Sequence, residues 1–236
     1  MHTDRGHCAL VYAFGAVTIN LTKTGLTHTP EVSNQVFELA TQSAELRGQF
    51  ISNGVVTIRS IVVSILLSVC LMALYSFDLA FIYLREAITM ILVLRVDNAA
   101  TMSRLNPHER ARRQRLYWEA FVHERFQAIV KYRPVMLPPL SSGIPEFDSS
   151  PPLGVHEGFV QIIELFLVVD DTFLRNWLSF ASSPASTAIT ATWIKEKQRE
   201  LDDQDLASPT LTSLSSGYSS ASLSDMQQAD LIITRH

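Results

Sequence analysis

The sequence NPHERARRQRLYWEAFVHERFQAIVKYRPVMLPP, residues 106–139, contains a helix whose start and end are both specified. Asn106 can cap the first turn, Pro107 suits the first helical position, and Glu109 has the spacing of a capping box. Pro134 ends the helix, because proline pushes the residue before it out of the helical region. The stretch therefore predicts one helix of about 25 residues followed by an extended exit.

Apolar residues recur at helical spacing on both sides of this stretch. Amphipathic patterns predict further helices over 30–50, 79–94, 156–178 and 187–205, and apolar runs over 8–19 and 60–77 indicate two more. The Pro- and Gly-containing segment 141–154 is typical of a surface loop. Since no stretch alternates convincingly at period two, the sequence predicts an all-α multi-helix bundle.

The charge-free segment 60–77 allows two interpretations, a membrane span or a buried helix. Its hydropathy permits insertion, but its 18 residues lie near the lower end of the roughly 17 to 25 that a span requires. The next apolar stretch contains Arg85, which at mid-membrane would cost about 2.5 to 3.5 kcal/mol. Serines at 60, 64 and 68 form a seam of small residues that would let another helix approach. We favour two helices stacked in a core and keep a membrane anchor at 60–77 as the alternative.

Composition excludes some classes of site. The chain has 236 residues and a net charge of −4, so it has no global basic footprint for nucleic acid. Cys8 and Cys70 are its only cysteines, too few for a disulfide framework or a cysteine-based zinc site. The sequence therefore implies no metal.

The residues also show no catalytic constellation. Glu119 and His123 are four apart and could face each other on the long helix, as a general base and its orienting group do. No nucleophile lies in a recognisable setting, and the sequence HERF lacks the second histidine of a zinc protease. We therefore expect that the chain is not an enzyme.

Five arginines at or near the start of the long helix form a basic run: Arg104, Arg110, Arg112, Arg113 and Arg115. Glu109 lies four residues before Arg113, and Glu119 lies four residues after Arg115, so the charges can form salt bridges along the helix. We expect acidic partners within the fold for these arginines rather than nucleic acid. On the apolar side of the same helix, we expect Trp118, Phe121, Val122 and Ile129 to anchor the core.

The residues from Arg112 to Pro139, RRQRLYWEAFVHERFQAIVKYRPVMLPP, resemble a segment of fungal zinc-cluster transcription factors. In that segment a basic start leads into an aromatic pair, an ERFxAI core and a proline-rich exit. FIYLREAITMILVLRVDN at 81–98 and the apolar pair at 61–84 look like preceding helices of that family. The helices at 158–178 and 191–203 look like later ones in a subgroup that regulates carbon-source use.

The resemblance implies the middle regulatory domain, the fungal-specific transcription factor domain, which is all-helical and restrains activation. It also implies a nuclear location and contacts with the transcription machinery or a co-regulator, with a small-molecule effector and a dimer as open options. It implies no membrane. The family's six-cysteine zinc cluster is absent, so no cofactor is expected in this chain, and DNA would be contacted only through a domain missing from it. The structural or regulatory candidates are Arg112, Arg113, Arg115, Trp118, Phe121, Glu124, Arg125 and Pro134.

The resemblance also predicts the domain organisation. We expect a partial regulatory domain over 1–206, a disordered Ser/Thr-rich insert over 207–228 and the start of a truncated helix over 229–236. The domain is expected to be incomplete at both ends. A fragment, a shortened gene prediction and a paralogue without DNA-binding capacity are the alternatives that this expectation leaves open.

Overall fold

The computed structural model describes residues 4–22, 29–48, 56–182 and 189–207, and helices are the only regular elements among them. This part of the chain is all-α, as the sequence predicts. The helices are α1 (Arg5–Thr22), α2 (Pro30–Arg47), α4 (Ile58–Ala73), α5 (Phe77–Val93), α6 (Ala99–Ser103), α7 (Pro107–Lys131), α8 (Leu153–Leu167), α9 (Asp171–Ser182) and α10 (Ala191–Ala207). The chain divides into two compact units, Met1–Ala188 and Ile189–His236, so α10 belongs to the second.

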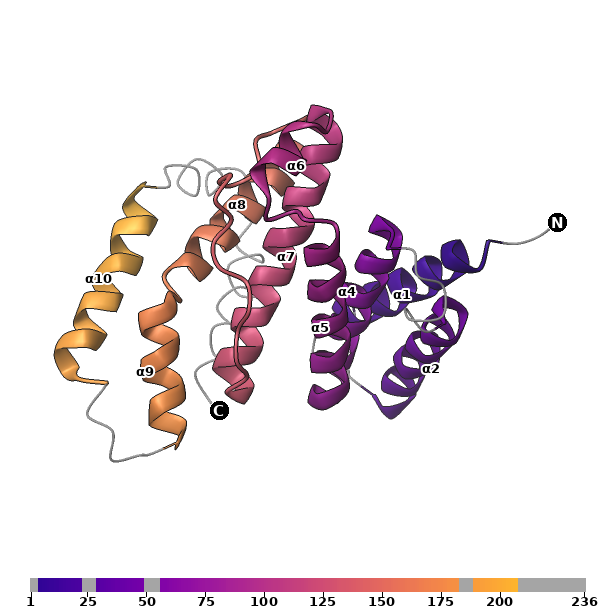
Figure 1. The fold of residues 1–236 in the computed structure, drawn as a ribbon. Coiled ribbons are helices and arrows are strands. Elements are labelled where there is room, and N and C mark those ends of the chain that lie inside the picture. The colour runs from indigo at the N-terminus through magenta and orange to yellow at the C-terminus, as the bar shows by residue number, and fades with distance from the viewer. Residues whose placement is uncertain (1–3, 23–28, 49–55, 183–188, 208–236) are drawn as a thin grey trace, which may run out of the picture. The chain divides into compact units, whose positions relative to one another are not determined.

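Within the first unit, α4 and α5 lie side by side (Figure 1). The helices α1 and α2 pack against each other and against α4, and α7 packs against α5 and α4. The main hydrophobic cluster joins α4, α5, α6, α7 and α8, and two smaller clusters join α1, α2 and α4. The helix α7 therefore lies between the central pair and the helices α8 and α9.

The predicted bounds of α7 are confirmed. The Asn106 side chain accepts a hydrogen bond from the backbone N–H of Glu109 at 2.8 Å, and Pro107 is the first helical residue. Tyr132 ends the helix in a left-handed conformation with φ of 53°. The capping-box interpretation is right only for Asn106. The Glu109 carboxylate instead binds Arg112 and Arg113, because a charged guanidinium is a stronger donor to it than a neutral backbone N–H.

The seam of small residues on α4 allows α5 to approach closely. Ser64 and Ser68 are buried, and the Ser68 hydroxyl donates to the carbonyl oxygen of Ala80 on α5 at 2.8 Å. The helix α4 has 16 residues and ends at Ala73, four residues short of the predicted segment. None of the helices described is long and apolar enough to cross a membrane, so the alternative of an anchor at 60–77 is not favoured.

The single helix predicted over 156–178 is wrong, because the chain forms α8 and α9 with a break between them. Asp170 lies in this break, and its carboxylate accepts from the backbone N–H of Phe173 at 2.6 Å. An aspartate in this position caps a new helix start, and this local preference interrupts the apolar periodicity.

The remaining predictions fall at the two ends of the chain. In α1 only one side is buried, with Ala9, Ala13 and Ala16 inside while Val11 and Phe14 stay exposed. Ala207 ends α10, and the rest of the predicted insert and the predicted final helix lie outside the described residues.

Candidate functional site

The apolar candidates Trp118 and Phe121 lie in the core. Their side chains are buried, and the two rings meet edge to face with centroids 4.8 Å apart. The indole N–H of Trp118 donates to the carbonyl oxygen of Gly143 at 3.0 Å, which ties α7 to the loop that follows it. Val122 and Ile129 were also expected in the core but are only partly buried, because they lie at the margins of this face of α7.

Glu124 and Arg125 hold the extended segment that follows α7. The Glu124 carboxylate pairs with Arg85 of α5 at 2.6 Å and accepts from the backbone N–H groups of Met136 and Leu137 at 2.8 and 2.9 Å. The Arg125 guanidinium donates to the carbonyl oxygens of Val169 and Leu137, each at 3.1 Å. We call this set of contacts the α7 cradle.

Burial sets the electrostatics of the α7 cradle. Desolvation raises the pKa of the Glu124 carboxyl, although the Leu137 and Met136 N–H groups and Arg85 favour its charged form. Desolvation also lowers the pKa of Arg125 to about 10, and its guanidinium carbon lies 3.3 Å from the centre of the Phe121 ring. Arg125 therefore stays charged at neutral pH and donates hydrogen bonds to the backbone carbonyl oxygens of two distant segments.

Pro134 belongs to the same arrangement. Its carbonyl oxygen accepts from Arg85, while its ring is exposed. Arg133 forms an ion pair with Asp78 at the start of α5. The residues that end α7 thus fasten the extended segment to α5.

The three arginine candidates at the start of α7 have acidic partners, as expected. Arg112 and Arg113 share Glu109 at 2.6 and 2.8 Å, so one carboxylate serves two guanidinium groups. Arg115 was expected to pair with Glu119, but it binds Asp148 in the following loop at 3.0 Å. The reason is that Glu119 pairs with His123 on the next turn, at 3.0 Å.

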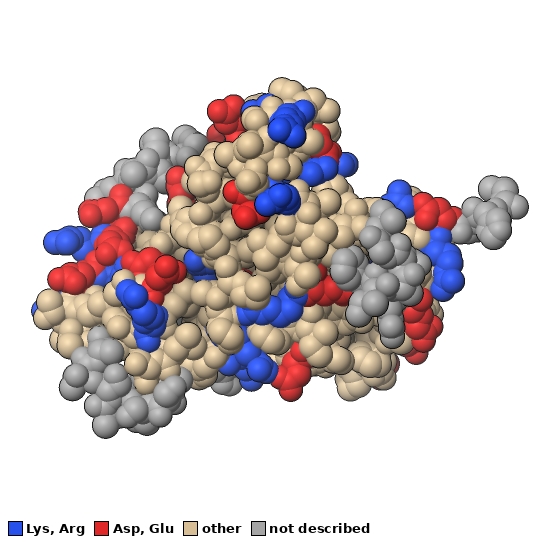
Figure 2. Space-filling view, in the orientation of Figure 1, with Lys and Arg blue, Asp and Glu red and all other residues tan. Residues whose placement is uncertain are grey.

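The Arg115 pair affects the protonation of its partner. Hydrogen bonding from Arg115 lowers the pKa of Asp148 from 3.8 to about 2, with smaller support from Ser150. On the face drawn in Figure 2, basic and acidic groups are interspersed over the upper end, where α6 and the start of α7 lie. The ion pairs of Arg112, Arg113 and Arg115 stabilise the start of α7 and its contact with the following loop.

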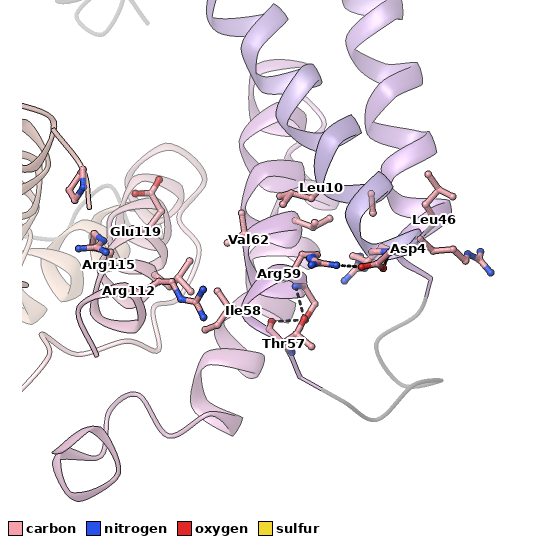
Figure 3. A pocket seen from close by; sticks show the side chains of 18 of the residues that line it. Asp4, Leu10, Leu46, Thr57, Ile58, Arg59, Val62, Arg112, Arg115 and Glu119 are labelled. Atoms are coloured by element: carbon pink, nitrogen blue, oxygen red, sulfur yellow. Dashed lines mark hydrogen bonds and ion pairs between the residues drawn. The ribbon is translucent and has the colours of Figure 1, made fainter. Parts of the chain in front are cut away.

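A cavity of about 1340 Å³ lies beside Arg112 and Arg115. Its walls come from the start of α1, the end of α2, the first half of α4, the first half of α7 and the residues from Pro151 to Phe159. In Figure 3, Arg112, Arg115 and Glu119 of α7 lie across the opening from Ile58 and Val62 of α4. We call this space the arginine-lined cavity, because Arg5, Arg47, Arg59, Arg112 and Arg115 line it.

One wall of the arginine-lined cavity contains an interaction that sequence reasoning missed. Arg47, at the end of α2, pairs with Glu86 of α5 at 2.7 Å and donates to the Ser64 hydroxyl at 3.1 Å. Arg47 also lies over the ring of Tyr83. The signal in the sequence was the Arg85–Glu86 pair inside an apolar helix, since charged residues there must find partners when they are buried.

Among the described residues, neither the α7 cradle nor the arginine-lined cavity brings together the chemical groups needed for catalysis. Glu119 and His123 contact each other as expected, but on the partly exposed surface of α7. Within the described ranges, no group of three or more His, Cys, Asp or Glu side chains could hold a metal ion. Cys70 is buried, and desolvation raises the pKa of its thiol to about 12, so it is not a reactive nucleophile.

Comparison with known proteins gives one distant similarity. The chain is 26% identical over 182 residues to the "Probable sucrose utilization protein SUC1" of Candida albicans. The match covers 76% of this chain and 33% of that protein, so the chain spans about a third of the length of this relative. No protein-family model matches the chain, and no solved structure matches it.

The similarity is to a fungal protein, and the sequence pattern from Arg112 to Pro139 also resembles fungal proteins. The relative's name gives a role in sucrose utilization.

Proposed function

We propose that this chain is part of the helical regulatory domain of a fungal transcription regulator that serves the use of a carbon source such as sucrose. The observation that carries the proposal is the similarity to a probable sucrose utilization protein over 182 residues, because it extends across most of the helices. The all-α fold and the sequence pattern from Arg112 to Pro139 support it.

In this proposal the chain acts in the nucleus through contacts with other proteins, and it does not read DNA by itself. The support is electrostatic. Arg112, Arg113 and Arg115 are bound to Glu109 and Asp148, and the chain's net charge is −4. These three arginines and their two carboxylate partners carry one net positive charge, which is a small electrostatic footprint for a nucleic acid that presents many phosphates.

A tethering experiment tests the regulatory role. The chain is fused to a bacterial DNA-binding domain in a yeast that carries a matching reporter gene, and the reporter is measured on glucose and on sucrose. We expect reporter activity to differ between the two media, with the fusion in the nucleus. A Trp118→Ala fusion is the control for folding. Equal activity in both media, at the level of the DNA-binding domain alone, would contradict the proposal.

The claim about DNA has a separate test. The purified chain is titrated with a labelled duplex at several salt concentrations. We expect weak binding with a shallow dependence on salt. Tight binding that weakens steeply with salt would show that the chain itself contacts DNA phosphates.

A further inference from the structure

The arginine-lined cavity has the size and the lining of a small-molecule site. Its volume of about 1340 Å³ exceeds the roughly 300 to 1000 Å³ typical of ligand pockets, so a small metabolite fits with room for water. Leu10, Ile58, Val62, Leu116 and Phe159 give it apolar surface. Such a surface favours a ligand that has an apolar part.

The charged groups at the cavity favour an anion over a cation. Five arginines line it, against the two carboxylates of Asp4 and Glu119. Both carboxylates already have a partner, since Asp4 binds Arg59 and Glu119 binds His123. Four of the arginines also have a carboxylate partner, namely Arg47, Arg59, Arg112 and Arg115. The preference for an anion therefore comes from the larger number of guanidinium groups at the cavity.

Arg112 is the arginine best placed to hold that anion. It shares the Glu109 carboxylate with Arg113, so the two guanidinium groups have a single negative charge between them. Its side chain is 48% exposed, against 21% for Arg115, which is bound to Asp148 through both of its terminal nitrogens. In Figure 3, Arg112 extends from α7 toward Ile58 of α4.

Two further cavity residues have unused hydrogen-bonding capacity. Among the described residues, Nε of Arg47 and Nδ1 of His156 are buried and have no hydrogen-bond partner. Both residues line the cavity. A buried polar atom without a partner is costly, so the wall of the cavity contains two polar groups whose desolvation is not compensated within the described residues.

We propose that the arginine-lined cavity binds a small organic anion, with a carboxylate or phosphate group on Arg112 and an apolar part against Ile58, Val62 and Leu116. This site is independent of the proposed role in transcription, because its evidence is the cavity alone.

The probe is 8-anilinonaphthalene-1-sulfonate, which joins an aromatic body to an anionic group, titrated into the full 236-residue chain and followed by fluorescence. The comparison is N-phenyl-1-naphthylamine, which has the same body without the sulfonate. We expect saturable binding of the sulfonate at one site, and binding of the neutral amine about tenfold weaker or more, as the loss of one charge-assisted contact predicts. Equal affinity for the two dyes would overturn the proposal.

Three variants locate the site. Arg112→Gln should weaken the sulfonate about tenfold while leaving the fold intact, because Glu109 keeps its pair with Arg113. Val62→Trp should reduce binding by filling the cavity. Arg104→Gln removes an exposed arginine that does not line the cavity and should change nothing. Unchanged binding in Arg112→Gln, with its helical circular dichroism retained, would overturn the proposal even if Val62→Trp failed to fold.

Displacement of the dye identifies the anionic group. We expect octanoate or octyl phosphate to displace it, and the one that does so at lower concentration indicates whether the site prefers a carboxylate or a phosphate. Displacement by neither would contradict the proposal.

Discussion

The Glu124 carboxylate accepts from the backbone N–H groups of Met136 and Leu137 and pairs with Arg85 in a buried setting. In Glu124→Ala these three donors lose their acceptor, and Arg85 is left with the carbonyl oxygen of Pro134. Removal of one partner of a buried ion pair costs about 3 to 5 kcal/mol, so we expect a loss of this size in the free energy of unfolding. Urea denaturation measures it through the midpoint and slope.

A matched control for this variant lies on the same helix. Glu119 is 41% exposed and binds His123 alone. We expect Glu119→Ala to change the free energy of unfolding by less than about 1 kcal/mol. Similar losses in the two variants would show that the contacts of Glu124 in the α7 cradle have no special weight.

The side chain of Trp118 is 1% exposed and packs on Phe121. Trp118→Ala should lower the free energy of unfolding by about 3 to 5 kcal/mol, because it leaves a cavity and an unsatisfied carbonyl at Gly143. Trp118→Phe keeps most of the ring and should cost less. A loss below about 1 kcal/mol in Trp118→Ala would mean that this face of α7 is not packed as described.

At this scale the sequence was informative about burial and less so about partners. Helical spacing indicated that Trp118 and Phe121 face the core, and a charge pattern along one helix paired Arg113 with Glu109. Partners from distant segments, such as Asp148 for Arg115, have no periodic signal. Neither the roles of Glu124 and Arg125 toward backbone atoms nor the pairing of Arg47 with Glu86 could be derived from spacing, because both depend on how helices meet in space.

At the scale of elements, the contact between α7 and its following loop depends on pH. The folded-state pKa of Asp148 is depressed to about 2 by hydrogen bonding from Arg115. A depressed carboxyl pKa means that the contribution to stability is complete above the ordinary value of 3.8 and is lost as the pH falls toward about 2.

An NMR titration of the Asp148 carboxyl carbon tests this dependence. We expect a midpoint near pH 2 in the wild-type chain and a midpoint closer to 3.8 in Arg115→Gln, because that variant loses the principal hydrogen bond. A midpoint near 3.8 in both proteins would show that the contact between α7 and the loop does not form in solution.

Some helix ends could be predicted from the sequence and others could not. Asn106 specifies the start of α7 by capping it, and Pro134 specifies its end. The helix begins and ends beside these two residues. The break between α8 and α9 was missed because apolar residues continue at helical spacing through Val169. The cap at Asp170 is a signal of a single residue, whereas the apolar periodicity around it extends over several turns.

At the scale of the whole molecule, stability should be unevenly distributed. The main cluster consists largely of residues from α4, α5 and α7, whereas almost all described side chains of α10 are exposed or partly so. We expect the slowest amide hydrogen exchange in α4, α5 and α7 and faster exchange in α10. Mass spectrometry of exchanged peptides measures this, and α10 peptides as protected as those of α7 would contradict it.

The all-α class followed from the sequence, because long apolar stripes at helical spacing leave few alternatives. The arginine-lined cavity did not, since a cavity is defined by what several helices fail to fill. Its lining comes from α1, α2, α4, α7 and α8, which are separated by up to about 150 residues of chain.

The neighbouring residues Arg85 and Glu86 make ion pairs on two sides of α5, Arg85 with Glu124 of α7 and Glu86 with Arg47 of α2. Successive residues on a helix project about 100° apart, so the two pairs together fix the rotation of α5 about its own axis. The contacts from Arg47 through Glu86, Arg85 and Glu124 to the backbone of Met136 and Leu137 thus connect the end of α2 with the segment that follows α7.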